Sequence, residues 1–317
     1  MPTVPSLRSM LGKRRLVRRV HATLQQAAQA WKLWPQPVLP PDRLRPPWPY
    51  EDPEPTFPGL VSQACTDMQL RSRDYRAWGD RLRVRDVYMH RKQWEWFYIA
   101  QALEESGQVR PGARGIGFGV GTEPLTPWFA SQGCTVLATD YPGGEHADGW
   151  SSTGELAHSL ADLNAEGICD PQVFESNVSF QPVDMRDLSD LDGPFDFSWS
   201  SCALEHLGSI DEGLRFLERH VELLGPGGVG VHTTELNVSS NDRTLDHVPT
   251  VLFRRRDLED FVRTIAPVAE VAPLNFHLGR TPNDLYVAPS SGFTSTMLRY
   301  DMGAFVTTSF GLIIRKR

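Results

Sequence analysis

Short apolar runs alternate with amphipathic stretches through most of the chain. Runs of strand type occupy residues 115–118, 135–139, 180–183, 195–200 and 229–234, and helical spacing fills the segments beside them. This alternation predicts an α/β fold, in which helices cover both faces of a mostly parallel sheet. Residues 304–315 predict a final strand at the edge of that sheet.

The N-terminal part of the chain has a different pattern. Apolar residues recur at helical spacing over residues 6–34, among basic residues, and predict an amphipathic helix. Residues 35–58 are dense in proline and predict an extended connector, so residues 1–60 form a unit of their own. The helix could be a peripheral membrane contact, or it could pack on the core, either as a lid or as the contact of a homodimer.

Residues 61–317 are expected to form one domain, whose core begins at about residue 107. The pattern over residues 61–107 is helical, and a helix is predicted to end near Gly107. The apolar side of this helix consists of Tyr88, Trp94, Trp96, Phe97, Ile99 and Leu103.

Charge and cysteine content narrow the class of protein. The formal charge is -7, and the segment from Met1 to Trp34 has seven basic and no acidic residues, which leaves -14 for the remainder. An acidic body argues against a nucleic-acid-binding protein. The four cysteines lack the close pairs of zinc or redox sites, and no apolar run is long enough for a membrane span, so we expect a cytoplasmic protein.

A glycine-rich turn follows the first core strand. Gly117, Gly119 and Gly121 lie between a predicted strand and a predicted helix, where glycine lets the backbone approach a ligand closely. Nineteen residues after Gly121, the next strand ends at Asp140. Nucleotide-binding folds place a carboxylate there to bind both ribose hydroxyls, although a helix cap is an alternative role for Asp140.

The series of elements resembles class I S-adenosylmethionine (SAM)-dependent methyltransferases from about residue 91 onward. Asp184 and Met185 follow the third strand, residues 195–206 match the strand and loop beneath the methyl donor, and residues 223–228 match the turn before the fifth strand. The resemblance implies a Rossmann-like, seven-stranded sheet with an N-terminal helical extension, and SAM as cofactor. It implies that Gly117, Gly119 and Gly121 bind the methionine portion, Asp140 the ribose, and Asp184 with Met185 the adenine, with Ser200 beside the donor.

One position departs from the family. Gly115 stands where these enzymes commonly have an acid, and Glu123 could make the contact to the amino group of SAM instead. A dinucleotide-dependent oxidoreductase shares the glycine turn and the acid of this sequence. That class gives no reason for the Leu-Gly-Pro-Gly-Gly turn over residues 224–228.

Candidate catalytic residues follow the fourth and fifth strands. His232 is the first candidate for a general base, with His206 and Glu235 assisting or positioning the acceptor, because a strand end should expose them. His206 could instead shape the cofactor pocket. A divalent ion such as Mg²⁺ is a further possibility, with candidate ligands Glu205, His206, His232 and Asp246.

A looser resemblance concerns the acceptor. Residues 91–95, 118–125, 232–237, 253–258 and 307–312 are similar to bacterial methyltransferases that accompany glycosyltransferases in polysaccharide pathways. This similarity implies O-methylation of a sugar hydroxyl, on a mannose-type or other cell-surface glycan. The alternatives are a natural-product O- or N-methyltransferase that acts on small molecules, and a non-catalytic SAM-binding scaffold.

Overall fold

The computed structural model describes residues 44–45, 47–84, 87, 89–141, 157, 159–289 and 296–317. The predicted N-terminal helix, the first part of the proline-rich connector and Tyr88 lie outside these residues. The proposed membrane or dimer contact of that helix therefore stays a prediction. No helix of the described segments is both long and apolar enough to cross a membrane.

Five parallel strands form the centre of the fold, in the spatial order β5-β4-β3-β6-β7. Their bounds are Arg114–Phe118 for β3, Thr135–Asp140 for β4, Val178–Pro182 for β5, Phe195–Ser201 for β6 and Leu224–Asn237 for β7. The chain first adds strands on one side of β3 and then returns to add β6 and β7 on the other. The predicted Rossmann-like α/β fold is confirmed by this arrangement, in which a ligand site is expected where the order reverses, between β3 and β6.

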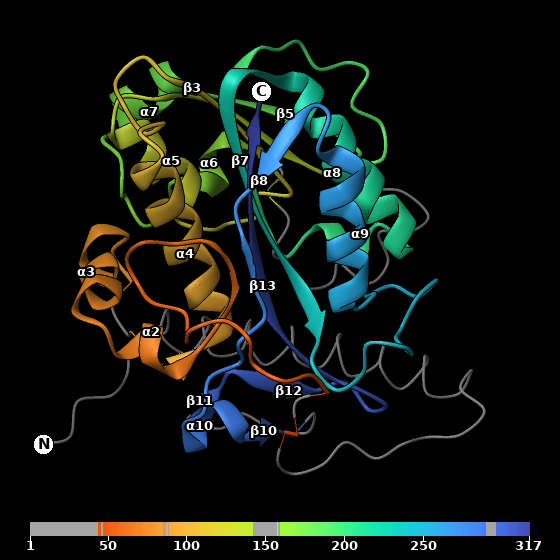
Figure 1. The fold of residues 1–317 in the computed structure, drawn as a ribbon. Helices are drawn as coiled ribbons and strands as arrows, with labels where there is room; N and C mark the ends of the chain where they lie inside the picture. Colours follow the sequence, from red (N-terminus) through yellow and green to blue (C-terminus); the bar gives the residue numbers. More distant parts are fainter. Residues whose placement is uncertain are drawn as a thin grey trace, which may run out of the picture.

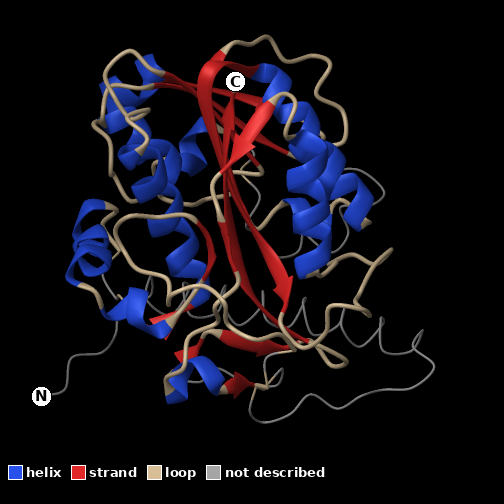
Figure 2. Cartoon of the chain, in the orientation of Figure 1, coloured by secondary structure: helices blue, strands red, loops and turns tan. Residues whose placement is uncertain are grey.

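Helices cover both faces of this sheet, as predicted (Figures 1 and 2). On one side lie α4 (Arg91–Glu105), α5 (Leu125–Ser131), α6 (Leu160–Leu163) and α7 (Pro171–Asn177), and on the other lie α8 (Ile210–Leu223) and α9 (Arg255–Ile265). In α8, Ile210, Gly213, Leu217 and Val221 are buried at helical spacing, and the Ser209 hydroxyl caps the helix by accepting from the amide of Glu212 at 3.1 Å.

Two predictions about the sheet are corrected. Within the described residues the sheet has eleven strands instead of seven, because further strands extend it beyond β7. Strand β13 (Val306–Lys316) is not at the edge: it pairs antiparallel with β7 along one side and with β1 (Ser62–Ala64), β8 (Ala269–Val271) and β12 (Arg299–Asp301) along the other. Strand β13 is therefore an interior strand, and its residues 306–312 are all buried.

The segment before the core is less regular than predicted. Helix α4 ends at Glu105, close to the predicted end at Gly107, which has a φ of 74°. It begins only at Arg91, where the His90 imidazole accepts from the amide of Lys92 at 3.0 Å. Residues 61–90 are not one helical stretch, since they also contain strand β1. Short elements complete the described fold: α2 (Asp67–Arg71), α3 (Arg73–Arg81), β2 (Met89–His90), β9 (Leu274–Asn275), α10 (Pro282–Leu285), β10 (Val287–Ala288) and β11 (Thr296–Met297).

Candidate functional site

The glycine turn lies at the end of β3, at the point where the strand order reverses. Gly119 and Gly121 have φ angles of 58° and 51°, in the left-handed region that favours glycine. A Cβ atom on Gly119 would lie 2.9 Å from Cβ of Ala203 and 3.8 Å from Sδ of Met185, so the turn touches the loop after β6 and the loop after β5. Gly117 has a packing role instead, because a Cβ there would lie 2.3 Å from the indole of Trp199.

Asp140 joins the turn to the end of β4. Its Oδ2 accepts from the amides of Gly121 at 3.1 Å and Ala157 at 2.9 Å, and its Oδ1 accepts from the amide of Tyr141 at 2.8 Å. The carboxylate is almost completely buried. Asp140 therefore lies beside the glycine turn, where the sequence places it.

The other predicted cofactor residues divide into two groups. Met185 is buried near Gly119, while Asp184 is half-buried and its carboxylate accepts from the guanidinium of Arg186 at 2.6 Å. This hydrogen bond lowers the pKa of Asp184. Glu123 lies two residues beyond Gly121 and is half-buried, before α5. Its contact with a cofactor stays a prediction, as does that of Asp184.

Ser200 and His232 lie together beneath α8. The Ser200 hydroxyl is 2.8 Å from Nδ1 of His232, and both side chains are fully buried. The His232 ring lies 4.4 Å from the ring of His220 on α8. Burial lowers the pKa of His232 well below its ordinary value, and the neighbouring His220 lowers it further.

The expectation that the strand end exposes His232 together with Glu235 is wrong. Successive side chains on a strand point to opposite faces, and positions 232 and 235 are an odd number of residues apart. His232 accordingly faces Phe216 and His220 of α8, while Glu235 faces α4. The structure does not bring these two predicted catalytic residues together.

Glu235 is the centre of a buried charged cluster on the α4 side. Its Oε1 lies 2.5 Å from a guanidinium nitrogen of Arg91 and 3.2 Å from Nζ of Lys92, and its Oε2 accepts from the hydroxyl of Thr307 at 2.8 Å. Burial acts to raise the pKa of Glu235, but the two cations outweigh it and lower the pKa to about 2. Glu235 is therefore a permanent anion at neutral pH.

Glu95, one turn after Arg91 on α4, extends this cluster. Its fully buried carboxylate accepts from the hydroxyls of Ser201 and Thr233, both at 3.3 Å, and from the hydroxyl of Ser309. The Cys202 thiol donates to Glu95 Oε1 at 3.2 Å, from a residue with a φ of 48°. Four segments thus meet here. They are the start of α4, the C-terminal parts of β6 and β7, and the first half of β13.

Glu205 lies over the strand ends, in the single turn of helix η2 (Leu204–His206). Its carboxyl is fully buried; Oε2 accepts from the hydroxyl of Thr234 at 3.3 Å, and Oε1 has no hydrogen-bond partner among the described residues. Burial raises the pKa of Glu205 to about 7, against the opposing effect of Lys92. His206 is next to it, with Nε2 at 3.8 Å from Oε1 of Glu205.

The predicted metal ligands are not gathered around one point. Asp246 caps α8, since its Oδ1 accepts from the amides of Ile210 at 2.9 Å and His247 at 2.8 Å, and the His232 side chain is buried against α8. A different trio does converge, with ligand atoms of Cys202, Glu205 and Glu235 within 4.8 Å of one another. The cations Arg91 and Lys92 already bind Glu235, and a thiol is a poor ligand for Mg²⁺, so these residues do not fit a magnesium ion.

The sequence contained a usable signal for the missed residues. Arg91, Lys92 and Glu95 were not predicted as site residues, although they begin an otherwise aromatic and apolar helix. Ions at the buried start of such a helix need charged partners elsewhere in the chain. The charged partner of Arg91 and Lys92 is Glu235, and the Ser309 hydroxyl is a partner of Glu95; both depend on the tertiary structure.

No family model matches the chain, and no curated protein matches its sequence. Solved structures with a similar fold include a 1,6-didemethyltoxoflavin-N1-methyltransferase from Burkholderia thailandensis, with bound S-adenosylhomocysteine. That match has 18% identity and a TM-score of 0.41, and it covers 72% of this chain and 79% of that one. An amino pentose methyltransferase from Micromonospora echinaspora matches with 15% identity and a TM-score of 0.40, over 76% and 96% of the two chains.

A third match is shorter. It is to a proposed sarcosine dimethylglycine methyltransferase from Galdieria sulphuraria, with 17% identity and a TM-score of 0.34. It covers 45% of this chain and 46% of that one, so the matched region spans about half of that protein. Similarity at this level does not specify a shared reaction.

Proposed function

We propose that this protein is a SAM-dependent methyltransferase that transfers a methyl group to a hydroxyl of a sugar or polysaccharide precursor. One observation carries the proposal: Ala203 joins the predicted donor site to the polar cluster. Its Cβ faces the Gly119 turn, and its carbonyl oxygen accepts from the amide of His206 at 3.1 Å, at the start of the turn that holds Glu205. Donor and acceptor groups would therefore be neighbours where the strand order reverses.

The residues at this edge fit a nucleoside with a methionine tail. Gly119 leaves open the space that a side chain would fill against Ala203, and Asp140 fixes the turn through the amide of Gly121. Gly119 and Gly121 would hold the methionine portion, Asp140 the ribose, and Met185 the adenine. When bound, SAM supplies an electrophilic methyl group on a sulfonium.

The polar cluster favours an acceptor with hydroxyl groups. Ion pairs and hydroxyls line it, and the Tyr300 hydroxyl, which has no hydrogen-bond partner among the described residues, belongs to a ring lying 5.8 Å from the Arg91 guanidinium. A sugar hydroxyl can satisfy the Tyr300 hydroxyl, whereas an apolar acceptor would leave it unpaired.

Calorimetric titration with S-adenosylhomocysteine tests the proposal first. We expect binding by the wild-type protein and none by Asp140→Ala, because the glycine turn loses the carboxylate that holds it. Asp190→Ala is the matched control, since Asp190 is an exposed acid outside the site. Mass spectrometry of a mannoside panel incubated with SAM then tests the acceptor class, and a wild-type protein that does not bind S-adenosylhomocysteine refutes the proposed function.

A further inference from the structure

Three polar side chains converge on one point between α8 and the sheet. A Cβ atom on Gly230 of β7 would lie within 3.0 Å of all three. The polar atoms are Nε2 of His220 at 2.4 Å, Oγ of Ser198 at 2.9 Å and Nε2 of His232 at 3.0 Å. Each atom is buried and has no hydrogen-bond partner among the described residues. Buried polar atoms without a partner are rare and costly, so three of them at one point indicate a binding site.

The alternation of side chains along β6 and β7 brings these groups together. Gly230 pairs with Ser198, and His232 pairs with Ser200, so these four residues face the same side of the sheet, toward α8. His220 projects onto this face from α8, and the centre of its ring lies 4.4 Å from that of His232. Because residue 230 is a glycine, no side chain from this position stands between the three polar atoms.

The other nitrogen of each imidazole is already bound. Nδ1 of His220 lies 2.6 Å from the carbonyl oxygen of Leu217, and Nδ1 of His232 lies 2.8 Å from the hydroxyl oxygen of Ser200. These contacts fix the orientation of both rings. The two Nε2 atoms are therefore held toward the same point as the Ser198 hydroxyl.

We propose that this point binds one water molecule, which joins α8 to β6 and β7. A buried water typically makes about three hydrogen bonds, and three atoms are offered here. Water both donates and accepts, so it satisfies these atoms whichever nitrogen of His232 carries the proton. The site is independent of the proposed methyl transfer, because its side chains face α8 and not the charged cluster on the α4 side.

A metal ion fits this point less well than water. Two neutral imidazoles are good zinc ligands, but a buried ion also needs an anionic partner to compensate its charge. Burial lowers the pKa of both His220 and His232, and no carboxylate of the described residues contributes to either shift. The charge of an ion would therefore stay uncompensated, whereas a water molecule brings no charge.

A crystal structure of the full chain tests the site directly. We expect one peak of electron density at about 2.8 Å from at least two of the three polar atoms, without an anomalous signal at the zinc edge. A peak with that anomalous signal overturns the inference in favour of a metal ion. The absence of any such peak also overturns it.

Oxygen-17 relaxation dispersion gives a second readout, because it counts water molecules that stay inside a protein for longer than its tumbling time. Gly230→Ala places a methyl group among the polar atoms and should lower this count by one. Gly225→Ala is the matched control on β7, since a Cβ there would meet its nearest atom at 3.5 Å. Neither glycine has a positive φ, so alanine strains the backbone at neither position.

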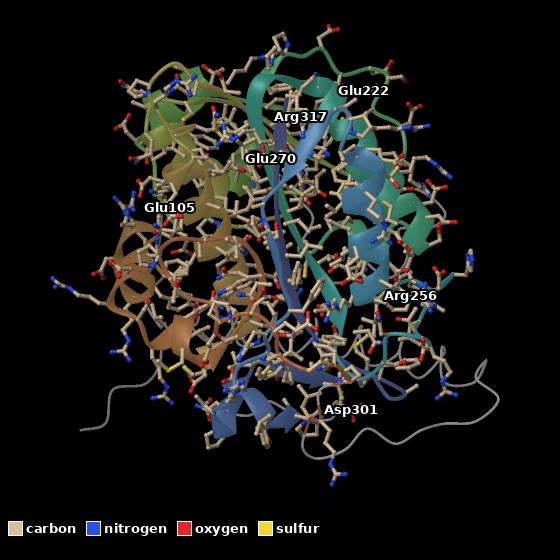
Figure 3. The ribbon with its side chains drawn as sticks, in the orientation of Figure 1. Glu105, Glu222, Arg256, Glu270, Asp301 and Arg317 are labelled. Carbon is tan, nitrogen blue, oxygen red and sulfur yellow. The ribbon has the colours of Figure 1, made fainter. Side chains whose placement is uncertain are left out.

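Ser198→Val is a second test, which applies even if Gly230→Ala does not fold. It removes the hydroxyl, fills the same space from β6 and should also lower the count by one. Glu222→Gln should leave the count unchanged, because Glu222 is exposed on the last turn of α8, at the opposite end of the sheet from Asp301 and β12 (Figure 3). A folded Gly230→Ala or Ser198→Val protein with the same count as the wild type overturns the inference.

Discussion

The two faces of β7 bury polar residues of opposite character. On the α4 side, Glu235 is an anion that Arg91 and Lys92 hold between them. On the α8 side, His232 lies against His220, and burial lowers the pKa of both rings so that they are neutral at neutral pH. Nε2 of neither ring has a hydrogen-bond partner among the described residues.

The comparison shows that one strand can bury ion pairs on one face and neutral polar side chains on the other. Paired charges tolerate burial because each ion has a fixed partner, whereas the histidines tolerate it by giving up their charge. Neither face holds a group that changes protonation state easily near pH 7. That property falls to Glu205, over the strand ends and next to the loop that touches the glycine turn.

The largest effect is expected from removing a cation on the α4 side. Arg91→Met leaves Glu235 buried with one of its two ion-pair partners lost, and it should lower the free energy of unfolding by about 3–5 kcal/mol. Urea denaturation at neutral pH measures the loss. Arg215→Met, which breaks the exposed pair with Glu212, should cost at most about 1 kcal/mol, and equal losses in the two variants would contradict the comparison.

Glu205 should make the protein less stable at neutral pH than at acidic pH. Its folded-state pKa is raised above the unfolded value, so its stabilising contribution is present below pH 4.5 and is lost as the pH rises through about 7. Between pH 5 and pH 8, the unfolding free energy of the wild type should fall by about 2 kcal/mol more than that of Glu205→Gln. Denaturation curves at the two pH values measure this, and Glu222→Gln should show the same fall as the wild type.

His220 should act in the opposite direction. Burial lowers its pKa from 6.5 to about 4. Between these pH values the unfolded chain binds a proton at His220 and the folded protein does not, so stability is lost as the pH falls through this window. The contribution is about 2 kcal/mol between pH 7 and pH 5. His220→Phe should remove this acid sensitivity, whereas His247→Asn, on an exposed loop, should leave it unchanged. If the His220→Phe protein is as acid-sensitive as the wild type, the neutral pair on the α8 side is disproved.

The smallest effect concerns Ser200. Ser200→Ala leaves Nδ1 of His232 without its partner and should cost about 1 kcal/mol of unfolding free energy. Because the hydroxyl faces α8, the affinity for S-adenosylhomocysteine should stay within twofold of the wild type. A clear loss of affinity would place Ser200 at the cofactor, as the family resemblance implies. It would contradict the assignment of Ser200 and His232 to a purely structural role on the α8 side.

The alternation of apolar runs located the core strands to within a few residues, with one exception. Strands β3, β4 and β6 have almost their predicted bounds, because each is a short apolar segment that must be buried on both faces. Strand β7 is longer than predicted, since it begins at Leu224 within the glycine-containing turn. Leu224 pairs with Phe195 of β6 at an irregularity in the register, while β13 pairs with residues 229–237 of β7. No local pattern reveals such partners.

Local sequence by itself determined the chemistry of the glycine turn, because Gly119, Gly121 and the acid at Asp140 are fixed by a strand, a tight turn and the next strand. It also determined that His232 and Glu235 face opposite sides, since side chains alternate along any strand. Only the tertiary structure decided which side holds charge. Arg91 and Glu235 are 144 residues apart, and their ion pair exists because α4 packs across the ends of β7 and β13. Burial is a property of the assembled layers, and it is burial that raises the pKa of Glu205 and leaves His232 neutral.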